Sequence, residues 1–196
     1  MSRQGKVWLV GAGPGDVGLF TIKGKDILAK AEVVVYDSLV GDGVLTMVPE
    51  NAEKINVGKR AGHHTMKQEN INKVLLEKAQ EGKRVVRLKG GDPFLFGRGG
   101  EELELLCEHK IPYEVVPGVT SCIAVPAYNG IPVTHRDFCS SVHVITGHTL
   151  KGAQSEKELA SYGACEGTLV FLMGLNNLNT ISAGLIKGGK PADTPT

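Results

Sequence analysis

Three glycine-rich segments carry most of the residues that could bind a ligand or take part in chemistry. The first is 11–16, GAGPGD, which directly follows a short apolar run. The second is 87–102, RLKGGDPFLFGRGGEE, and the third is 116–138, VPGVTSCIAVPAYNGIPVTHRDF. Glycine lets a backbone approach a ligand closely, and loops that follow strands are common binding positions in α/β proteins.

The first segment only partly matches a dinucleotide-binding loop. That loop needs G-x-G-x-x-G at the start of a helix, where free amides meet the pyrophosphate. Here Asp16 stands where the third glycine belongs, Pro14 has no amide hydrogen, and the next helix is expected only from about Thr21. Asp37 ends the second expected strand, where a ribose-binding acid would lie, so a dinucleotide stays open as the minor alternative.

The other two segments have both a structural and a functional interpretation. Gly90 and Gly91 end an expected strand and Asp92 adds an acceptor, which suits either a ligand or a tight turn. Thr120 and Ser121 offer hydroxyls at an expected helix start, where they could bind a ligand or cap the helix. Both interpretations of the third segment can hold together, because connectors between domains often border ligand sites.

The segment 57–64, VGKRAGHH, is a compact basic cluster. Lys59 and Arg60 follow a short expected strand, and a solvated surface explains them as well as a ligand does. His63 and His64 have no third ligand at metal spacing, so we expect no metal. The sequence also lacks a GxSxG nucleophile motif, and its cysteines have no catalytic context.

Composition limits the classes of partner. The 196 residues have a formal net charge of +1, which gives no overall attraction to nucleic acid or to a membrane. No apolar run reaches membrane-spanning length. The four cysteines are far apart without CxxC spacing, which is typical of reduced thiols in a cytoplasmic protein. An acidic ligand would therefore need a local basic cluster.

Alternating strand and helix patterns predict an α/β fold. Apolar, β-branched runs predict buried strands at 6–10, 32–37, 84–89 and 113–118. One helix is expected after a capping box of Thr65 and Gln68, with an apolar stripe and an end at Gly82; the stripe consists of Ile71, Val74, Leu75 and Ala79. Another is expected from about Gly100 to His109.

We expect two α/β domains, 1–117 and 118–196. The second has expected strands at 141–148 and 168–174, separated by a polar stretch with a loop or short helix. These are too few strands to complete a domain, so we expect it to be truncated at its C-terminus.

Six segments, in their order along the chain, resemble the tetrapyrrole methylases. They are VGAGPGD, VVVYDSLV, NVGKRAG, RLKGGDPFLFGRGGEE, VPGVTSCIAVPAYNGIPVTHR and ITGH, within about residues 5–195. GPGD alone is typical of the wider superfamily, whereas GGDPFLFGRGGEE and PAYNGIPVTHR are typical of the branch that C-methylates uroporphyrinogen III.

The resemblance implies a homodimer whose two α/β domains bind S-adenosyl-methionine in the cleft between them. It implies two methyl transfers to uroporphyrinogen III, giving precorrin-2 for sirohaem or cobalamin, without nucleic acid, membrane or metal. Another tetrapyrrole methylase acting on a later precorrin, and a non-catalytic binder of S-adenosyl-methionine or tetrapyrrole, remain open.

The resemblance also implies roles for individual residues. Asp37 would be the proton acceptor and Lys59 the proton donor. The cofactor-binding residues would be Pro14, Gly90, Gly91, Asp92, Leu95, Thr120, Ser121 and Met173. Ser121 stands where the family usually has Ala, and Ser38 where it usually has Arg. Since the substrate has eight carboxylates, basic residues such as Lys59, Arg60 and Arg98 would have a purpose despite the near-neutral net charge.

Overall fold

The computed structural model describes residues 4–58, 66–149 and 152–195. It divides into two compact units, Met1–Ser121 and Cys122–Thr196, which we call the first and second unit. The division lies a few residues after the expected boundary at 117. No helix of the described residues has the length and apolar character needed to cross a membrane.

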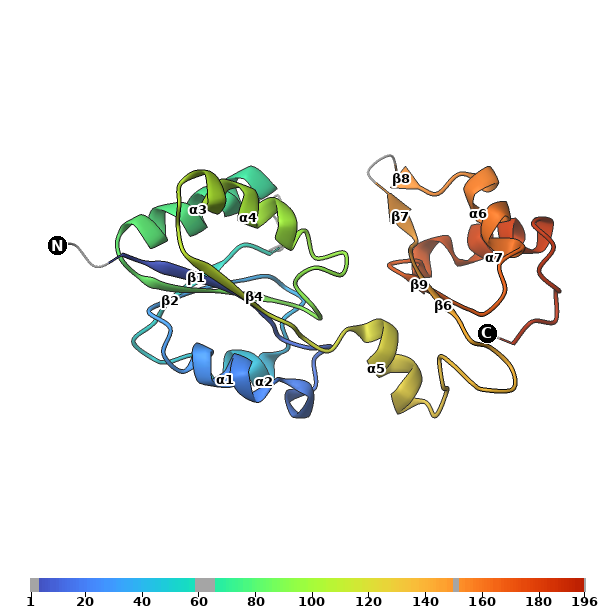
Figure 1. The fold of residues 1–196 in the computed structure, drawn as a ribbon, viewed down its shortest axis with the longest axis horizontal. Helices are drawn as coiled ribbons and strands as arrows, with labels where there is room; N and C mark the ends of the chain where they lie inside the picture. Colours follow the sequence, from blue (N-terminus) through green and yellow to red (C-terminus); the bar gives the residue numbers. More distant parts are fainter. Residues whose placement is uncertain (1–3, 59–65, 150–151, 196) are drawn as a thin grey trace. The chain divides into compact units, whose positions relative to one another are not determined.

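The described part of the first unit is a five-stranded sheet with helices on both faces. The strand order is β3-β2-β4-β1-β5, and every pair is parallel. The strands are β1 (Lys6–Gly11), β2 (Val33–Tyr36), β3 (Glu53–Asn56), β4 (Arg84–Lys89) and β5 (Tyr113–Val116). Helices α3 (Gln68–Gln80) and α4 (Gly99–Glu108) cover one face, and α1 (Ile22–Leu28) and α2 (Asp42–Leu45) cover the other (Figure 1). The predicted α/β fold is confirmed.

Two apolar clusters fix the layers of this unit. Successive strand side chains point to opposite faces, so Leu9 packs into the cluster with Leu75 of α3, and Val10 into the cluster with Leu28 of α1. The middle strands β2 and β4 are buried on both faces, which explains the apolar run of β2.

The start of α3 corrects one expectation. The N-cap is Lys67 without a side-chain cap, and Gln68 bonds instead to Asn72 and Glu102. The capping box with Thr65, a residue outside the described ranges, is therefore wrong. Gly82 does end this helix, with a φ of 80° that favours glycine.

The second unit has less regular structure. Helix α5 (Ser121–Tyr128) begins at the division, and β6 (Val142–Thr146) pairs in parallel with β9 (Thr168–Leu172). The remaining elements are β7 (His148–Thr149), β8 (Gly152–Ala153), α6 (Glu156–Gly163) and α7 (Leu178–Lys187), with short 3-10 helices at Val17–Leu19 in the first unit and Leu175–Asn177 in the second. Helix α6 packs against α7, and a capping box of Ser155 and Glu158 starts α6.

Candidate functional site

The carboxyl edge of the first unit's sheet gathers most of the predicted site residues. Parallel strands end on the same side, so the loops after β1, β2, β4 and β5 meet there. Pro14 follows β1, Asp37 follows β2, Gly90 follows β4, and Thr120 follows β5. These residues are distant in sequence, and the fold brings their loops to one edge.

Backbone hydrogen bonds join the loop after β1 to the loop after β4. The amide of Gly91 donates to the Gly13 carbonyl (2.8 Å), and the Gly13 amide donates to Gly91 (3.2 Å). The Ala12 amide donates to the Lys89 carbonyl (2.7 Å). The first glycine loop thus uses these amides within the protein, and Pro14 has none to offer. A pyrophosphate would find few donors here, which agrees with the sequence argument against a dinucleotide.

Close packing and one carboxylate attach the loop after β5. A Cβ on Gly11 would lie 2.5 Å from the Gly118 Cα and 2.6 Å from the Gly91 carbonyl oxygen, so only glycine fits. Asp92 Oδ1 accepts the amides of Phe94 (2.8 Å) and Leu95 (3.1 Å), and Oδ2 accepts the Gly118 amide (3.1 Å). The carboxylate of Asp92 therefore holds the second segment against the third.

Asp37 lies directly beside these loops. A Cβ on Gly90 would come within 2.5 Å of the Leu39 Cβ, which places the loop after β2 against the end of β4. Asp37 Oδ1 accepts the Leu39 amide (3.0 Å), and Oδ2 accepts Arg87 Nη2 (3.1 Å). The Asp37 side chain keeps 22% of its surface exposed, so a substrate can reach it.

A buried ionic network stands behind Asp37. Arg87 Nε and Lys89 Nζ both donate to Glu102 Oε1, at 3.1 and 2.9 Å. Burial, more than the neighbouring Arg87, lowers the pKa of Lys89. Sequence reasoning missed this network because it took 84–89 simply as a buried strand. The signal was present, since charged residues are almost never fully buried unless they are paired.

The remaining described candidates differ in exposure. Pro14, Leu95, Thr120 and Ser121 are half-buried. Met173 follows β9 in the second unit and is 59% exposed. Because the two units are described separately, the predicted place of Met173 in one site with the others stays a prediction.

Positive backbone angles occur in the candidate segments. Phe96, Arg98 and Met173 have φ of 53°, 57° and 58°, which costs side-chain-bearing residues energy. Arg98 forms a bidentate pair with Glu101, at 2.9 and 2.6 Å. That hydrogen bond, above all, lowers the pKa of Glu101 and raises that of Arg98.

The basic segment lies outside the described residues. This concerns Lys59, Arg60, His63 and His64, so the predicted proton donor and the basic cluster stay predictions. Within 4–58, 66–149 and 152–195, no group of three or more His, Cys, Asp or Glu side chains is arranged to hold a metal ion.

Comparison with known proteins identifies the family. The model of the tetrapyrrole (corrin/porphyrin) methylases matches residues 6–196. The chain belongs to the tetrapyrrole methylases. It is 58% identical to a porphyrin biosynthesis protein HemD of Ruminiclostridium josui, over 98% of this chain and 38% of that protein. It is 54% identical to a siroheme synthase of Escherichia fergusonii, over 100% of this chain and 42% of the relative.

A solved structure extends the comparison to three dimensions. The uroporphyrin-III C-methyl transferase of Thermus thermophilus, complexed with S-adenosyl homocysteine, matches with a TM-score of 0.81 at 42% identity. The match covers 95% of this chain and 78% of the Thermus chain. This methylase chain spans about 40% of the length of the two curated relatives named above.

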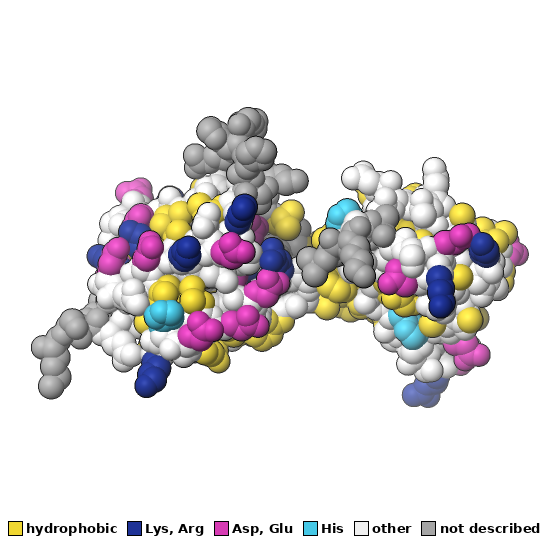
Figure 2. Space-filling model, turned by 90° about the horizontal axis from the view of Figure 1, so that it is seen from above, with side chains coloured by type: hydrophobic (Ala, Val, Ile, Leu, Met, Phe, Trp, Pro, Cys, Tyr) yellow, Lys and Arg dark blue, Asp and Glu magenta, His cyan; other side chains and the backbone are white. Residues whose placement is uncertain are grey.

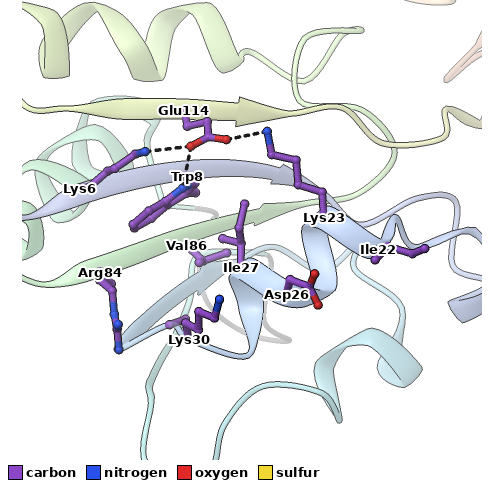
Figure 3. Close-up of a pocket in the computed structure, with 11 residues that line it drawn as sticks. Lys6, Trp8, Ile22, Lys23, Asp26, Ile27, Lys30, Arg84, Val86 and Glu114 are labelled. Atoms are coloured by element: carbon purple, nitrogen blue, oxygen red, sulfur yellow. Dashed lines mark hydrogen bonds and ion pairs between the residues drawn. The ribbon is translucent and has the colours of Figure 1, made fainter.

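One cavity of this tetrapyrrole methylase lies away from the candidate site. It has a volume of about 630 Å³ beside α1 and the starts of β1 and β4 (Figure 3). Lys6, Lys23 and Trp8 all bond to Glu114 on its wall, at 2.8, 2.6 and 3.2 Å. None of the predicted site residues lines it. This cavity is therefore separate from the predicted site at the carboxyl edge.

The surface charge of the methylase is mixed. Figure 2 shows basic and acidic side chains interspersed on the visible face of the first unit, in agreement with the net charge of +1. On this face, recognition of an acidic ligand thus depends on individual side chains rather than on a broad basic field.

Proposed function

We propose that this protein transfers methyl groups from S-adenosyl-methionine to ring carbons of uroporphyrinogen III. The observation that carries the proposal is the position of Asp37 beside Gly90–Asp92 at the carboxyl edge, stabilised by the bonds of Gly13 and Asp92. The 42% identity to a uroporphyrin-III C-methyl transferase supports it.

The carboxyl edge suits S-adenosyl-methionine better than a dinucleotide. This cofactor has no phosphates, so the scarcity of free amides around Pro14 is no obstacle. A Cβ on Gly91 would reach van der Waals contact with the Thr120 Cα, at 4.0 Å, so the loops after β4 and β5 lie against each other there. In the proposal, Gly90, Gly91, Leu95, Thr120 and Pro14 hold the adenosyl and amino acid parts. Ser121 and Met173 complete the proposed set, while Asp92 orders the loop.

The proposed mechanism gives Asp37 the proton transfer. When bound, S-adenosyl-methionine supplies a methyl group that is activated by its positive sulfur. A pyrrole carbon attacks that methyl, the carbon–sulfur bond breaks, and its electron pair stays on sulfur. The transferred methyl cation leaves the ring positively charged, and Asp37 accepts the proton whose loss makes the ring neutral again. A proton that Lys59 donates at one ring position is matched by the loss of a second proton from another position. Alignment of substrate and methyl supplies much of the rate.

Basic side chains would recognise the substrate carboxylates. Arg98 is half exposed and its pair with Glu101 is on the surface, so a substrate carboxylate can replace Glu101. We propose that Lys59 and Arg60 also bind substrate carboxylates.

Two methyl transfers would give precorrin-2. The siroheme synthase relative favours the use of this product for sirohaem over its use for cobalamin. A homodimer and a cytoplasmic location complete the proposal.

Product analysis tests the proposed function. The protein is incubated without oxygen with S-adenosyl-methionine and uroporphyrinogen III, and the masses of the products are measured by mass spectrometry. We expect a product that carries two additional methyl groups. Transfer only to an already methylated precorrin would overturn the substrate assignment, and binding of both ligands without transfer would overturn the activity.

A further inference from the structure

Four charged side chains form a line from the buried side of α4 to the carboxyl edge. Glu102 is fully buried, Arg87 and Lys89 keep 4% of their side-chain surface exposed, and Asp37 keeps 22%. Two positive and two negative charges balance within the line. Exposure grows from Glu102 toward Asp37, so only the Asp37 end of the line is readily accessible to a substrate.

The geometry of Arg87 leaves it little freedom. Its Nε donates to Glu102 (3.1 Å), its Nη1 to the Leu88 carbonyl (2.8 Å), and its Nη2 to Asp37 (3.1 Å). A guanidinium is planar and holds its donors in fixed directions. Once Glu102 and Leu88 fix two of its nitrogens, the direction of the third is fixed as well.

Asp37 is therefore held at both oxygens. Its Oδ1 accepts the Leu39 amide and its Oδ2 accepts Arg87. Each carboxylate oxygen has two lone pairs, so among the described residues each has one partner and one lone pair left for a substrate. A base must be within hydrogen-bond reach of the proton it accepts, and holding both oxygens keeps the remaining lone pairs in one orientation.

Glu102 is the anchor of the arrangement. Its Oε1 accepts Arg87, Lys89 and Gln68, while its Oε2 is buried without a hydrogen-bond partner within the described ranges. Its negative charge balances the two buried cations Arg87 and Lys89 through one oxygen atom.

We propose that Arg87 is a positioning residue that orients the Asp37 carboxylate for proton transfer, and that buried Glu102 holds Arg87 in place. This inference rests on the proposed function, because it assumes that Asp37 accepts the proton. It adds two residues, neither of which touches the reacting atoms, to the machinery of the reaction.

A double-mutant cycle tests the inference by comparing Arg87→Gln in two backgrounds. In the otherwise unchanged protein we expect Arg87→Gln to lower kcat roughly 10- to 100-fold, the range for a mispositioned group. The KM for S-adenosyl-methionine should change less than about 3-fold, since the cofactor does not contact Arg87 in the proposal. In Asp37→Asn protein, the same change should lower kcat less than about 2-fold, because Arg87 acts through Asp37.

Two further variants separate positioning from stability. Arg84→Gln removes the same charge from the same strand, where Arg84 faces Glu32 instead of Asp37. We expect it to keep full kcat. Glu102→Gln keeps the side-chain shape and an acceptor oxygen while it removes the anchoring charge. If Arg87→Gln does not fold, Glu102→Gln takes its place in the cycle. We expect Glu102→Gln to lower kcat in the otherwise unchanged protein and to leave kcat unchanged in the Asp37→Asn background.

The outcomes are distinguishable. Equal losses of kcat in both backgrounds would show that Arg87 and Glu102 only stabilise the fold, and would overturn the inference while the proposed function stands. If the unchanged protein gives no methylated product, the proposed function fails and the inference fails with it.

Discussion

Asp37 and Asp92 both lie at the carboxyl edge, but their carboxylates have different surroundings. Asp37 contacts one amide and Arg87 and keeps an exposed face, whereas Asp92 accepts three amides from two loops. We therefore propose a chemical role for Asp37 and a role in loop order for Asp92, although the family resemblance implies that Asp92 binds the cofactor.

Replacing Asp37 should affect turnover and not cofactor binding. Asp37→Asn keeps the acceptor for the Leu39 amide but cannot accept a proton. We expect a large loss of kcat, with S-adenosyl-homocysteine affinity within about 1 kcal/mol of the unchanged protein. Steady-state kinetics and calorimetry measure the two effects. Full turnover in the variant would show that Asp37 is not the base.

Replacing Asp92 should affect stability first. Asp92→Ala leaves the amides of Phe94, Leu95 and Gly118 without their acceptor, which should cost about 1–3 kcal/mol of unfolding free energy. Asp92→Asn is the matched control, because its oxygen can still accept the first two amides. Urea unfolding should show the largest loss of unfolding free energy in Asp92→Ala and a smaller loss in Asp92→Asn. An unfolding free energy of Asp92→Ala equal to that of the unchanged protein would refute the structural role.

At the scale of elements, Glu114 joins three of them. It lies on β5 and pairs with Lys23 of α1 and Lys6 of β1 (Figure 3). Hydrogen bonds from Lys23, and next from Lys6, lower the pKa of Glu114 from 4.5 to about 2. The pairs stabilise the folded protein above pH 4.5, and this contribution is lost as the pH falls toward 2.

This pKa predicts a pH-dependent effect of Glu114→Gln. At pH 7 the variant should lose about 1 kcal/mol or less, since partly exposed pairs contribute little. The difference from the unchanged protein should shrink between pH 4.5 and 2. Urea unfolding across that range measures it, with Glu108→Gln on the exposed side of α4 as the charge control. A difference that is constant with pH would contradict the assigned pairs.

The elements were largely predictable from the sequence, and their side-chain contacts were not. The strand at 84–89 matches β4 residue for residue, and its apolar residues Val85, Val86 and Leu88 are fully buried. The expected capping box at the start of α3 is wrong because the N-cap is Lys67, and Gln68 bonds to Asn72 and, over a long range in the sequence, to Glu102 on α4. The network of Arg87 and Glu102 depends on the same kind of long-range pairing.

At the scale of the whole molecule, the two units differ in their cores. Both large apolar clusters of the described residues lie in the first unit. In the second unit, β6 and β9 form a two-stranded sheet among the described residues, and its buried apolar side chains include only a few large ones, such as Leu159 and Ile181. Two strands bury little apolar surface, so the second unit should be the less stable one.

Hydrogen exchange should reveal this difference. We expect strong amide protection in β1 and β4, which are central in the five-stranded sheet, and weak protection in β6 and β9. Mass spectrometry of peptides from both units, sampled over the same times, provides the comparison. Equal protection in both sheets would contradict the assigned order of stability.

The most direct test of the carboxyl-edge site is a calorimetric titration of this chain with S-adenosyl-homocysteine and, separately, with NAD. The amides of Ala12 and Gly13 are used within the protein and Pro14 has none, so a pyrophosphate would find few donors. We expect measurable binding of S-adenosyl-homocysteine and none of NAD. Tighter binding of NAD than of S-adenosyl-homocysteine would contradict it.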